Sequence, residues 1–227
     1  MYQTGFELTR AMYQRAMRET ENRRKDEAGR MLDYYQDSQL DYILDDIRSR
    51  YPHPDQLYPV GLNVVKKVIR NLAMVYMKDA VRTLDGSEAD KAILSEIETS
   101  AALPVKMKQA NRLSKLLGTV LLRPVWRNGR MDMDVLTPDV LDVDTGDTPE
   151  ELRAVQVTHY DPVGDVNEVT FTLWTPDMVR RMDANGHLIG EEPNPYGLLP
   201  FVPCWGQPVT DFFWQRGARD LMMIQDA

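Results

Sequence analysis

The fold is decided by one stretch, Gly118-Thr119-Val120-Leu121-Leu122-Arg123-Pro124-Val125-Trp126-Arg127-Asn128-Gly129-Arg130-Met131-Asp132-Met133-Asp134-Val135-Leu136. Its first half is rich in residues that favour strands, and Asn128-Gly129 is the strongest short-range signal for a two-residue hairpin turn. After the turn, apolar and acidic residues alternate, as on a strand with one buried face and one face in water. We therefore predict a hairpin directly after Gly118, with Met131, Met133 and Val135 facing inward.

The sequence before Gly118 has apolar side chains at the three- and four-residue spacing of amphipathic helices. Ser87 is placed to cap one of these helices, and Pro104 suits the first turn of another that ends at Leu117. A loop is predicted from Tyr51 through Pro59, and a long helix from Asn63 to Arg82. The stripes are Phe6, Tyr13 and Met17; Leu32, Tyr35, Leu40, Ile43 and Ile47; Val65, Val68, Ile69, Leu72, Val75 and Tyr76; and Ala89, Ile93, Ile97 and Ala101.

The sequence after Leu136 continues in short strands. Alternation predicts strands around residues 155–157 and 169–173, joined through 161–165, and Asn185-Gly186 marks another hairpin. This spacing of strands is typical of a small antiparallel sheet or barrel.

The last stretch begins with a proline-spaced segment, residues 194–203, which belongs at a sheet edge or in a linker because proline cannot donate to a ladder. Asp211 is predicted to cap a final helix that carries Phe212, Leu221, Met222 and Ile224. That helix has no stop signal before Ala227.

These elements predict an α+β fold. N-terminal helices and a proline-rich loop occupy residues 1–59, and further helices occupy residues 60–118. A small antiparallel β-rich part follows over residues 119–203, and residues 204–227 form a linker and the start of a long helix.

Composition excludes several classes of protein. The 227 residues, 43% hydrophobic and 27% charged, are typical of a globular chain of one or two domains. No apolar run approaches the ~18 residues of a transmembrane helix, and residues 1–30 show no secretory signal. A single cysteine, Cys204, excludes an internal disulfide, which favours the cytoplasm as the compartment. The net charge of −8 argues against a protein that holds DNA tightly over its whole surface.

The acids are concentrated between Met131 and Leu152, where eight stand without a single Lys or Arg. The residues from Asp142 onward do not fit the pattern of a calcium-binding loop, which needs an oxygen ligand at position 5, Gly at position 6 and Glu at position 12. Those positions are occupied by Gly146, Asp147 and Arg153. We predict that all eight acids lie on the solvent-exposed face of the β-rich part. Asp134→Asn should then have almost no effect on stability, whereas Met133→Asp should be strongly destabilising. The eight are Asp132, Asp134, Asp139, Asp142, Asp144, Asp147, Glu150 and Glu151.

Other chemistry-bearing residues form no recognisable site in the sequence. The histidines, His53, His159 and His187, are scattered, and Cys204 is predicted to be a small buried hydrophobe. No phosphate-binding glycine loop is present, and Lys66, Lys67 and Arg70 are predicted to form a charged outer helix face. We therefore predict no catalytic residue, metal or cofactor, and no enzymatic activity.

Three motifs follow one another along the chain. The first is Tyr34-Tyr35 on a helix, followed by a polar helix, a loop and the long helix from Asn63 to Arg82. The second is the hairpin with Leu136-Thr137-Pro138-Asp139-Val140. The third is Asn194-Pro195-Tyr196-Gly197-Leu198-Leu199-Pro200-Phe201-Val202, with Asp220-Leu221 and Gln225 after it. In this order, which covers nearly all of the chain, they resemble the portal proteins of tailed bacteriophages. The third motif is the most specific, since it is similar to the family pattern N-x-x-G-x-x-P-[FV]-V.

The resemblance implies a structural subunit of a ring, usually dodecameric, at one vertex of the phage head. Such a head–tail connector is the channel for DNA packaging into the capsid and for genome ejection. The implied partners are capsid and scaffolding proteins, the large terminase subunit, tail-connector proteins and passing double-stranded DNA, with no membrane. The implied location is the virion, after assembly in the host cytoplasm.

The resemblance also assigns parts of the chain. The helical and β-rich parts correspond to the family's wing, and residues from Asp211 onward to the start of the stem that lines the channel. The family's second stem helix, clip, channel loop and crown would follow, so we expect the complete gene product to extend beyond Ala227 and the 227-residue chain alone to form rings poorly. Candidate channel residues are Arg216, Arg219, Asp220 and Gln225, and candidate subunit-interface residues are Phe212, Trp214, Leu221, Met222 and Ile224.

Two other functions remain open at this stage. One is a metal-dependent nuclease with Asp132 and Asp134 as ligands, for which magnesium-dependent activity lost in Asp132→Ala would be evidence. The other is an α+β adaptor that binds another protein without forming a ring, for which a monomeric mass at high concentration would be evidence.

Overall fold

The computed structural model describes residues 5–51, 53, 63–74, 76, 78–163 and 166–225. The predicted loop from Pro54 through Pro59, the stripe residue Val75 and the turn residues Gly164-Asp165 lie outside the described residues. The described part is an α+β structure in which helices precede antiparallel sheets. Its helices are α1 (Gly5–Ala16), α2 (Glu19–Tyr35), α3 (Leu40–Arg50), α4 (Val64–Leu72), α5 (Glu88–Ser100), α6 (Leu103–Leu117) and α7 (Arg219–Gln225).

The apolar stripe from Leu32 to Ile47 does not lie on one helix. The chain breaks between α2 and α3 at Asp37, which has a φ of 71° in the left-handed region. The side chain of Asp37 accepts a hydrogen bond from Asn63 at 2.6 Å and pairs with Lys66. The contact with α4 therefore holds the turn between the helix that ends with Tyr34-Tyr35 and the separate helix that follows it.

The predicted helix from Asn63 to Arg82 is wrong in its length. Its start is correct, since the Asn63 side chain accepts from the backbone N–H of Lys66 at 2.7 Å, but α4 ends at Leu72. Val65 and Ile69 are fully buried, whereas Leu72 is 56% exposed. A nine-residue helix depends on packing of its apolar face for its stability.

The predicted hairpin is confirmed. Strands β1 (Thr119–Arg127) and β2 (Arg130–Leu136) pair in register through Arg127 opposite Arg130. Asn128 and Gly129 have φ values of 53° and 75°, as a type I′ turn requires. Strand β8 (Val202–Trp205) pairs with the other side of β1, so the proline-spaced segment ends as an edge strand.

The predicted antiparallel β-rich part is confirmed, and its strands form two sheets rather than a single sheet or barrel. The second sheet has the order β3-β4-β5-β6-β7, and all its neighbouring strands are antiparallel. Its central strands are covered on both faces, as the full burial of Ala154, Val155 and Gln156 shows. Its strands are β3 (Leu141–Thr145), β4 (Leu152–Val163), β5 (Val166–Trp174), β6 (Met178–Met182) and β7 (Leu188–Pro193).

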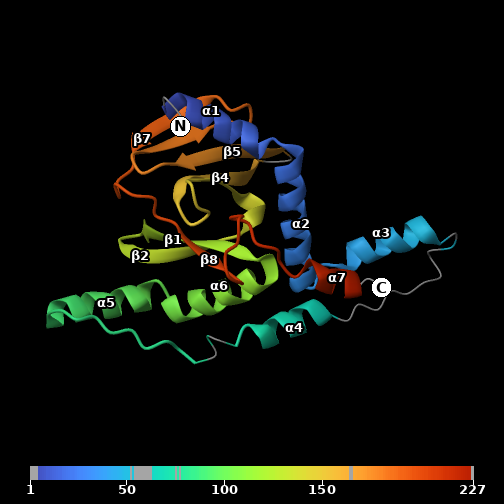
Figure 1. Cartoon of the computed structure of the whole chain (residues 1–227), viewed down its shortest axis with the longest axis horizontal. Coiled ribbons are helices and arrows are strands. Elements are labelled where there is room, and N and C mark those ends of the chain that lie inside the picture. Colours follow the sequence, from blue (N-terminus) through green and yellow to red (C-terminus); the bar gives the residue numbers. More distant parts are fainter. Residues whose placement is uncertain are drawn as a thin grey trace.

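The elements stack in layers, with α1 above the five-stranded sheet, then the three-stranded sheet, then α6 (Figure 1). Helix α2 runs along one side of both sheets and ends beside α4 and α7 (Figure 1). Three apolar clusters fill the spaces between these layers, and the largest joins Tyr34, Val65, Leu113, Val120 and Met222 from all four predicted segments. None of the helices in the described part combines the length and apolar composition needed to cross a bilayer.

Candidate assembly surface

The C-terminal segment does not become helical at Asp211. Its helix, α7, begins only at Arg219, so the prediction of a cap at Asp211 is wrong. The chain before α7 is instead bound by its backbone to the junction between α6 and β1. The fully buried Thr119 hydroxyl donates to the carbonyl of Phe213 at 3.2 Å and accepts from the N–H of Gln215 at 2.9 Å. These contacts use backbone groups that a helix over the same residues would need.

Helix α7 has an inner face that is bound within its own chain. Met222 is 5% exposed and belongs to the core shared by α2, α4 and α6, with Leu221 packed against it. The Gln225 side chain accepts from the backbone N–H groups of Val64 and Val65 at 3.0 and 3.2 Å. Gln225, a candidate channel residue, thus satisfies the first N–H groups of α4.

The other apolar candidates point outward. Ile224 is 68% exposed on α7, its neighbour Met223 is 61% exposed, and Phe212 is 72% exposed in the segment that leads to the helix. An apolar side chain exposed singly needs no explanation. Here, three large ones lie within thirteen residues of a segment whose other side chains are docked against the rest of the chain.

The charged candidates surround the docked segment. Arg216 and Asp220 line a groove of about 360 Å³ between α4, α6 and residues 206–221. Arg219 lies 3.5 Å from the carboxylate of Glu27 on α2, with 63% of its side chain exposed. The structure therefore places these three residues at the surface, next to the exposed apolar residues.

Trp214 connects the C-terminal segment to α2. The Arg24 guanidinium lies 4.1 Å from the centre of the Trp214 ring. Arg24 also donates to the carbonyls of Pro138 and Leu141, each at 2.6 Å. One side chain of α2 thus contacts the start of β3 and the segment before α7.

Two acids predicted to lie on a wet face are buried. Asp142 is 0% exposed, with Lys25 at 2.6 Å and Arg24 at 3.5 Å from its carboxylate, and Asp144 is 7% exposed, with Arg15 at 3.3 Å. Burial raises the pKa of Asp142, and the charges of Lys25 and Arg24 oppose that rise. The prediction failed because α1 and α2, which carry the bases, cover this face of the sheet.

One signal in the sequence could have located this cluster. Arg24, Ala28 and Met31 follow one another at helical spacing, so Arg24 lies on the buried stripe of α2. A cation on an apolar stripe needs a buried partner of opposite charge. The identity of the partner could not be read from the sequence, because Asp142 lies more than a hundred residues away.

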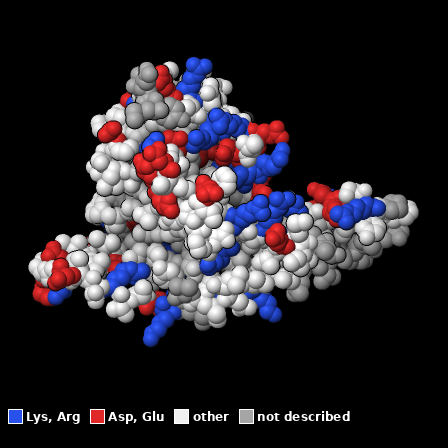
Figure 2. All heavy atoms as spheres, viewed as in Figure 1, with Lys and Arg blue, Asp and Glu red and all other residues white. Residues whose placement is uncertain are grey.

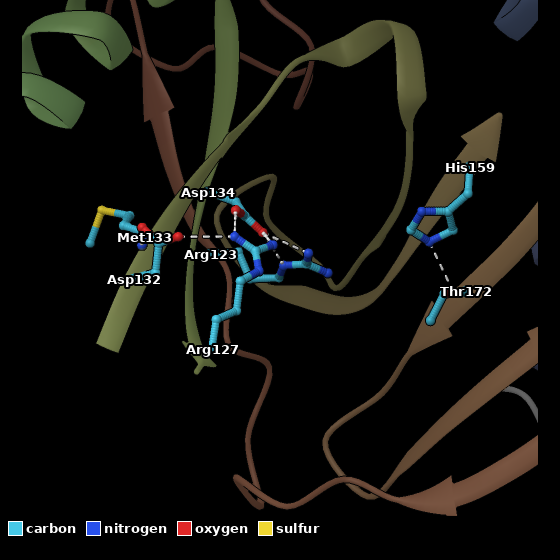
Figure 3. A network of polar contacts seen from close by, with 7 residues as sticks. All are labelled: Arg123, Arg127, Asp132, Met133, Asp134, His159 and Thr172. Carbon is cyan, nitrogen blue, oxygen red and sulfur yellow. Dashed lines mark hydrogen bonds and ion pairs between the residues drawn. The ribbon is translucent and has the colours of Figure 1, made fainter. Parts of the chain in front are cut away.

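The acids of β2 are held by arginines of β1 (Figure 3). Asp134 accepts from Arg123 at 2.7 Å and from both terminal nitrogens of Arg127 at 2.7 and 2.8 Å. Arg127 also contacts Asp132 at 3.1 Å. Burial by itself would raise the pKa of Asp134, but the hydrogen bonds and charges of Arg127 and Arg123 outweigh it and lower that pKa.

This network changes the expected effect of Asp134→Asn. We expect the variant to lose about 1–2 kcal/mol of unfolding free energy at pH 7, because it removes charged hydrogen bonds from a side chain that is 15% exposed. Since the folded-state pKa is lowered, the stabilisation is present above about pH 4 and is lost as the pH falls further. Urea unfolding should show a smaller gap between wild type and variant at pH 3 than at pH 7.

Asp132→Asn provides the matched control, because its carboxylate is more exposed and has one arginine partner. It should change stability less than Asp134→Asn at pH 7. Equal losses for the two variants, or a gap at pH 3 as large as the gap at pH 7, would contradict the role of the paired arginines. Met133 and Val135 do pack against the largest apolar cluster, as their alternation predicts.

The remaining histidines and the cysteine lie apart from one another. No three His, Cys, Asp or Glu side chains in the described part of the chain are placed to hold a metal ion. His187 contacts Asp183 at 3.1 Å in the β6–β7 turn, and His159 contacts Thr172 at 3.0 Å across β4 and β5. Burial raises the pKa of the Cys204 thiol, which leaves it less reactive.

The third motif forms a compact turn before β8. The amide of the buried Asn194 donates to the carbonyls of Thr175 and Leu198, each at 2.8 Å, and its oxygen accepts from the N–H of Tyr196 at 3.0 Å. Phe201, at the other end of the motif, packs between the two sheets. The residues that carry the resemblance thus position the edge strand that precedes the C-terminal segment.

No protein-family model matches the chain, and no curated protein matches it.

Proposed function

We propose that the protein is a structural subunit of a bacteriophage portal ring, the head–tail connector through which DNA enters and leaves the capsid. The observation that carries the proposal is the two-sided C-terminal segment. Its inner side chains, Met222 and Gln225, are bound within the chain, while Phe212 and Ile224 remain exposed. A second subunit that covers these apolar side chains would bury them at a ring interface.

The order of elements supports the same proposal. Tyr34-Tyr35 lies at the end of α2, Asn63 caps α4, and the Asn194 turn leads into β8 and then α7. Each motif behind the resemblance to portal proteins therefore has a definite structural role in this chain. The net charge of −8 suits a channel in which DNA must slide without being gripped.

The proposed partners follow from that function. They are further copies of the chain in a ring, usually twelve, with capsid and scaffolding proteins, the large terminase subunit, tail-connector proteins and passing double-stranded DNA. The proposed location is the capsid vertex of the virion. Arg216, Arg219 and Asp220 are proposed to face the channel, and Phe212, Trp214 and Ile224 the neighbouring subunit.

Assembly of the purified protein tests this proposal. We expect closed rings of uniform size by mass photometry and electron microscopy. Ile224→Glu should reduce the fraction in rings by about tenfold or more, because it places a carboxylate in an apolar contact. Ile189→Glu on β7 is the matched control, since that isoleucine is 60% exposed and remote from α7 in the sequence and the fold.

Two outcomes would contradict the proposal. A wild-type product that stays monomeric at high concentration would favour the adaptor that forms no ring. Rings that tolerate Ile224→Glu as well as Ile189→Glu would show that α7 is not at the subunit interface. Circular dichroism of both variants distinguishes loss of assembly from loss of folding.

The nuclease alternative is less well supported by the geometry. A metal bound by Asp132 and Asp134 would have to displace Arg127, whose guanidinium contacts both carboxylates. We therefore expect no magnesium-dependent cleavage of DNA and no ATP hydrolysis by the purified chain. Reproducible turnover that a point change such as Asp132→Ala abolishes would overturn this expectation.

A further inference from the structure

One groove on the surface combines an apolar wall with an arginine. It lies between the end of α2, the middle of α6 and the end of β2, and its volume is about 380 Å³. Leu32, Tyr35 and Val135 form the wall, where they pack against the largest apolar cluster and remain partly exposed. Arg112 also lines the groove, is exposed, and forms no ion pair within 4 Å among the described residues. The groove therefore suits an apolar group that has an acid next to it.

Asp211 and Phe212 present such a pair of groups in the C-terminal segment. The Phe212 side chain is 72% exposed, and Asp211 beside it is exposed and forms no ion pair with any described residue. The backbone is held here, because the next residue, Phe213, is buried between the two sheets and the Gln215 side-chain amide donates to the carbonyl of Phe212. An exposed aromatic ring on a fixed backbone loses little freedom on binding, which is typical of the residues that contribute most to protein interfaces.

The groove and the C-terminal segment lie on different sides of α6. Gln109 and Leu113 line the groove, whereas Ser114 and Lys115 meet the C-terminal segment. At 3.6 residues per turn, the two pairs of side chains point in directions that differ by roughly 170° around the helix axis. Phe212 is not part of the groove of its own chain. Both surfaces of one copy are therefore available to other copies.

We propose that Phe212 of one copy inserts into the groove of the next copy, with its ring against the apolar wall and with Asp211 paired with Arg112. Two different surfaces in contact form a head-to-tail interface, which produces a ring if the rotation closes. The contact thus identifies the surface of the neighbouring subunit that covers Phe212. Ring closure rests on the function proposed above, whereas the contact requires only a second copy.

A second copy fits the groove better than nucleic acid does. A phosphate group would match Arg112 but would leave the apolar wall uncovered. On the face that Figure 2 shows, acidic side chains lie among the basic ones, so the described residues there offer a phosphate backbone a mixed surface rather than a basic stripe. A second copy supplies both an aromatic ring and a carboxylate, and the contact covers the groove and the exposed Phe212 together.

Removal of the aromatic ring tests the apolar part of the contact. We expect Phe212→Ser in the purified protein to raise the concentration for half-association by about tenfold or more, because the ring is the anchor of the interface. Phe6→Ser is the matched control, since Phe6 is 71% exposed on α1, and it should leave association unchanged. Sedimentation velocity over a concentration series measures both variants, and thermal unfolding shows whether they remain folded.

Charge reversal with rescue tests the polar part. We expect Asp211→Lys and Arg112→Glu each to raise the concentration for half-association by about tenfold, since each places like charges together. The double variant restores opposite charges and should return that concentration to within about threefold of wild type. Arg130→Glu, an exposed reversal in the β1–β2 hairpin, is the control and should leave association unchanged.

The outcomes separate this contact from the ring itself. Closed rings that tolerate Phe212→Ser as well as Phe6→Ser would overturn the contact and leave the proposed function standing. Open chains of variable length, weakened by each single reversal and restored in the double variant, would support the contact and overturn the ring. Reversals that weaken association without rescue would overturn the pairing of Asp211 with Arg112. A wild-type protein that stays monomeric at high concentration would overturn both the contact and the ring.

Discussion

Replacement of Arg24 by alanine is expected to lower the free energy of unfolding by about 3–5 kcal/mol. The side chain is 18% exposed and donates to the backbone carbonyls of Pro138 and Leu141. It also lies against the Trp214 ring and within 3.5 Å of the fully buried Asp142 carboxylate. Its removal leaves Lys25 as the only cation on that carboxylate and two carbonyls without their donor.

Arg23→Ala is the matched control for this result. The two arginines are adjacent on α2, but the Arg23 side chain is 75% exposed and pairs only with Glu19, one turn away. Its loss should cost about 0.5 kcal/mol or less. Chemical denaturation of both variants measures the difference.

A double variant shows whether the effect of Arg24 comes from the buried charge. Asp142→Asn removes the carboxylate that Arg24 faces, so the double variant with Arg24→Ala should lose less stability than the sum of the losses in the two single variants. Equal destabilisation by Arg23→Ala and Arg24→Ala would contradict the account. A double variant whose loss of stability equals the sum of the losses in the two single variants would also contradict it, because additivity indicates independent sites.

Replacement of Gly118 by alanine is the second large expected effect, with a loss of more than about 3 kcal/mol. Gly118 has a φ of 84°, and a Cβ atom there would lie 2.1 Å from the carbonyl oxygen of Gln215. That oxygen belongs to backbone that is fixed by the hydrogen bond from Gln215 to Thr119. The added methyl group must therefore displace the C-terminal segment from the junction of α6 and β1.

Gly129→Ala separates the steric clash expected in Gly118→Ala from the cost of placing an alanine in the left-handed backbone conformation. Its φ of 75° is similar, but no atom lies within 4 Å of a Cβ built there. We expect it to cost about 1–2 kcal/mol, the penalty of the left-handed conformation alone. The difference in unfolding free energy between Gly118→Ala and Gly129→Ala measures the steric cost of the close contact between residue 118 and the C-terminal segment. Equal losses would show that the segment moves away from the added methyl group at little cost.

The local parts of this fold could be predicted from the sequence. The hairpin at Asn128-Gly129 and the helix cap at Ser87 each depend on residues within a few positions of one another. The same is true of the helix that has Pro104 in its first turn and ends at Leu117, and of the inward-facing Met133. For these elements, turn chemistry, capping and periodicity all act over a single turn or strand, and tertiary contacts do not override them.

The sequence alone determined the α+β class, the change from helix to strand at Gly118 and the motifs behind the proposed ring subunit. Only the tertiary structure decided that α4 ends at Leu72, that Asp142 is buried, and that α7 starts at Arg219. Each of these features depends on a partner far away in the chain: the core that α4 contacts, the bases of α2, and the backbone at Thr119. Burial and pairing of this kind are set by which surfaces meet, and a pattern read over a few residues cannot specify that.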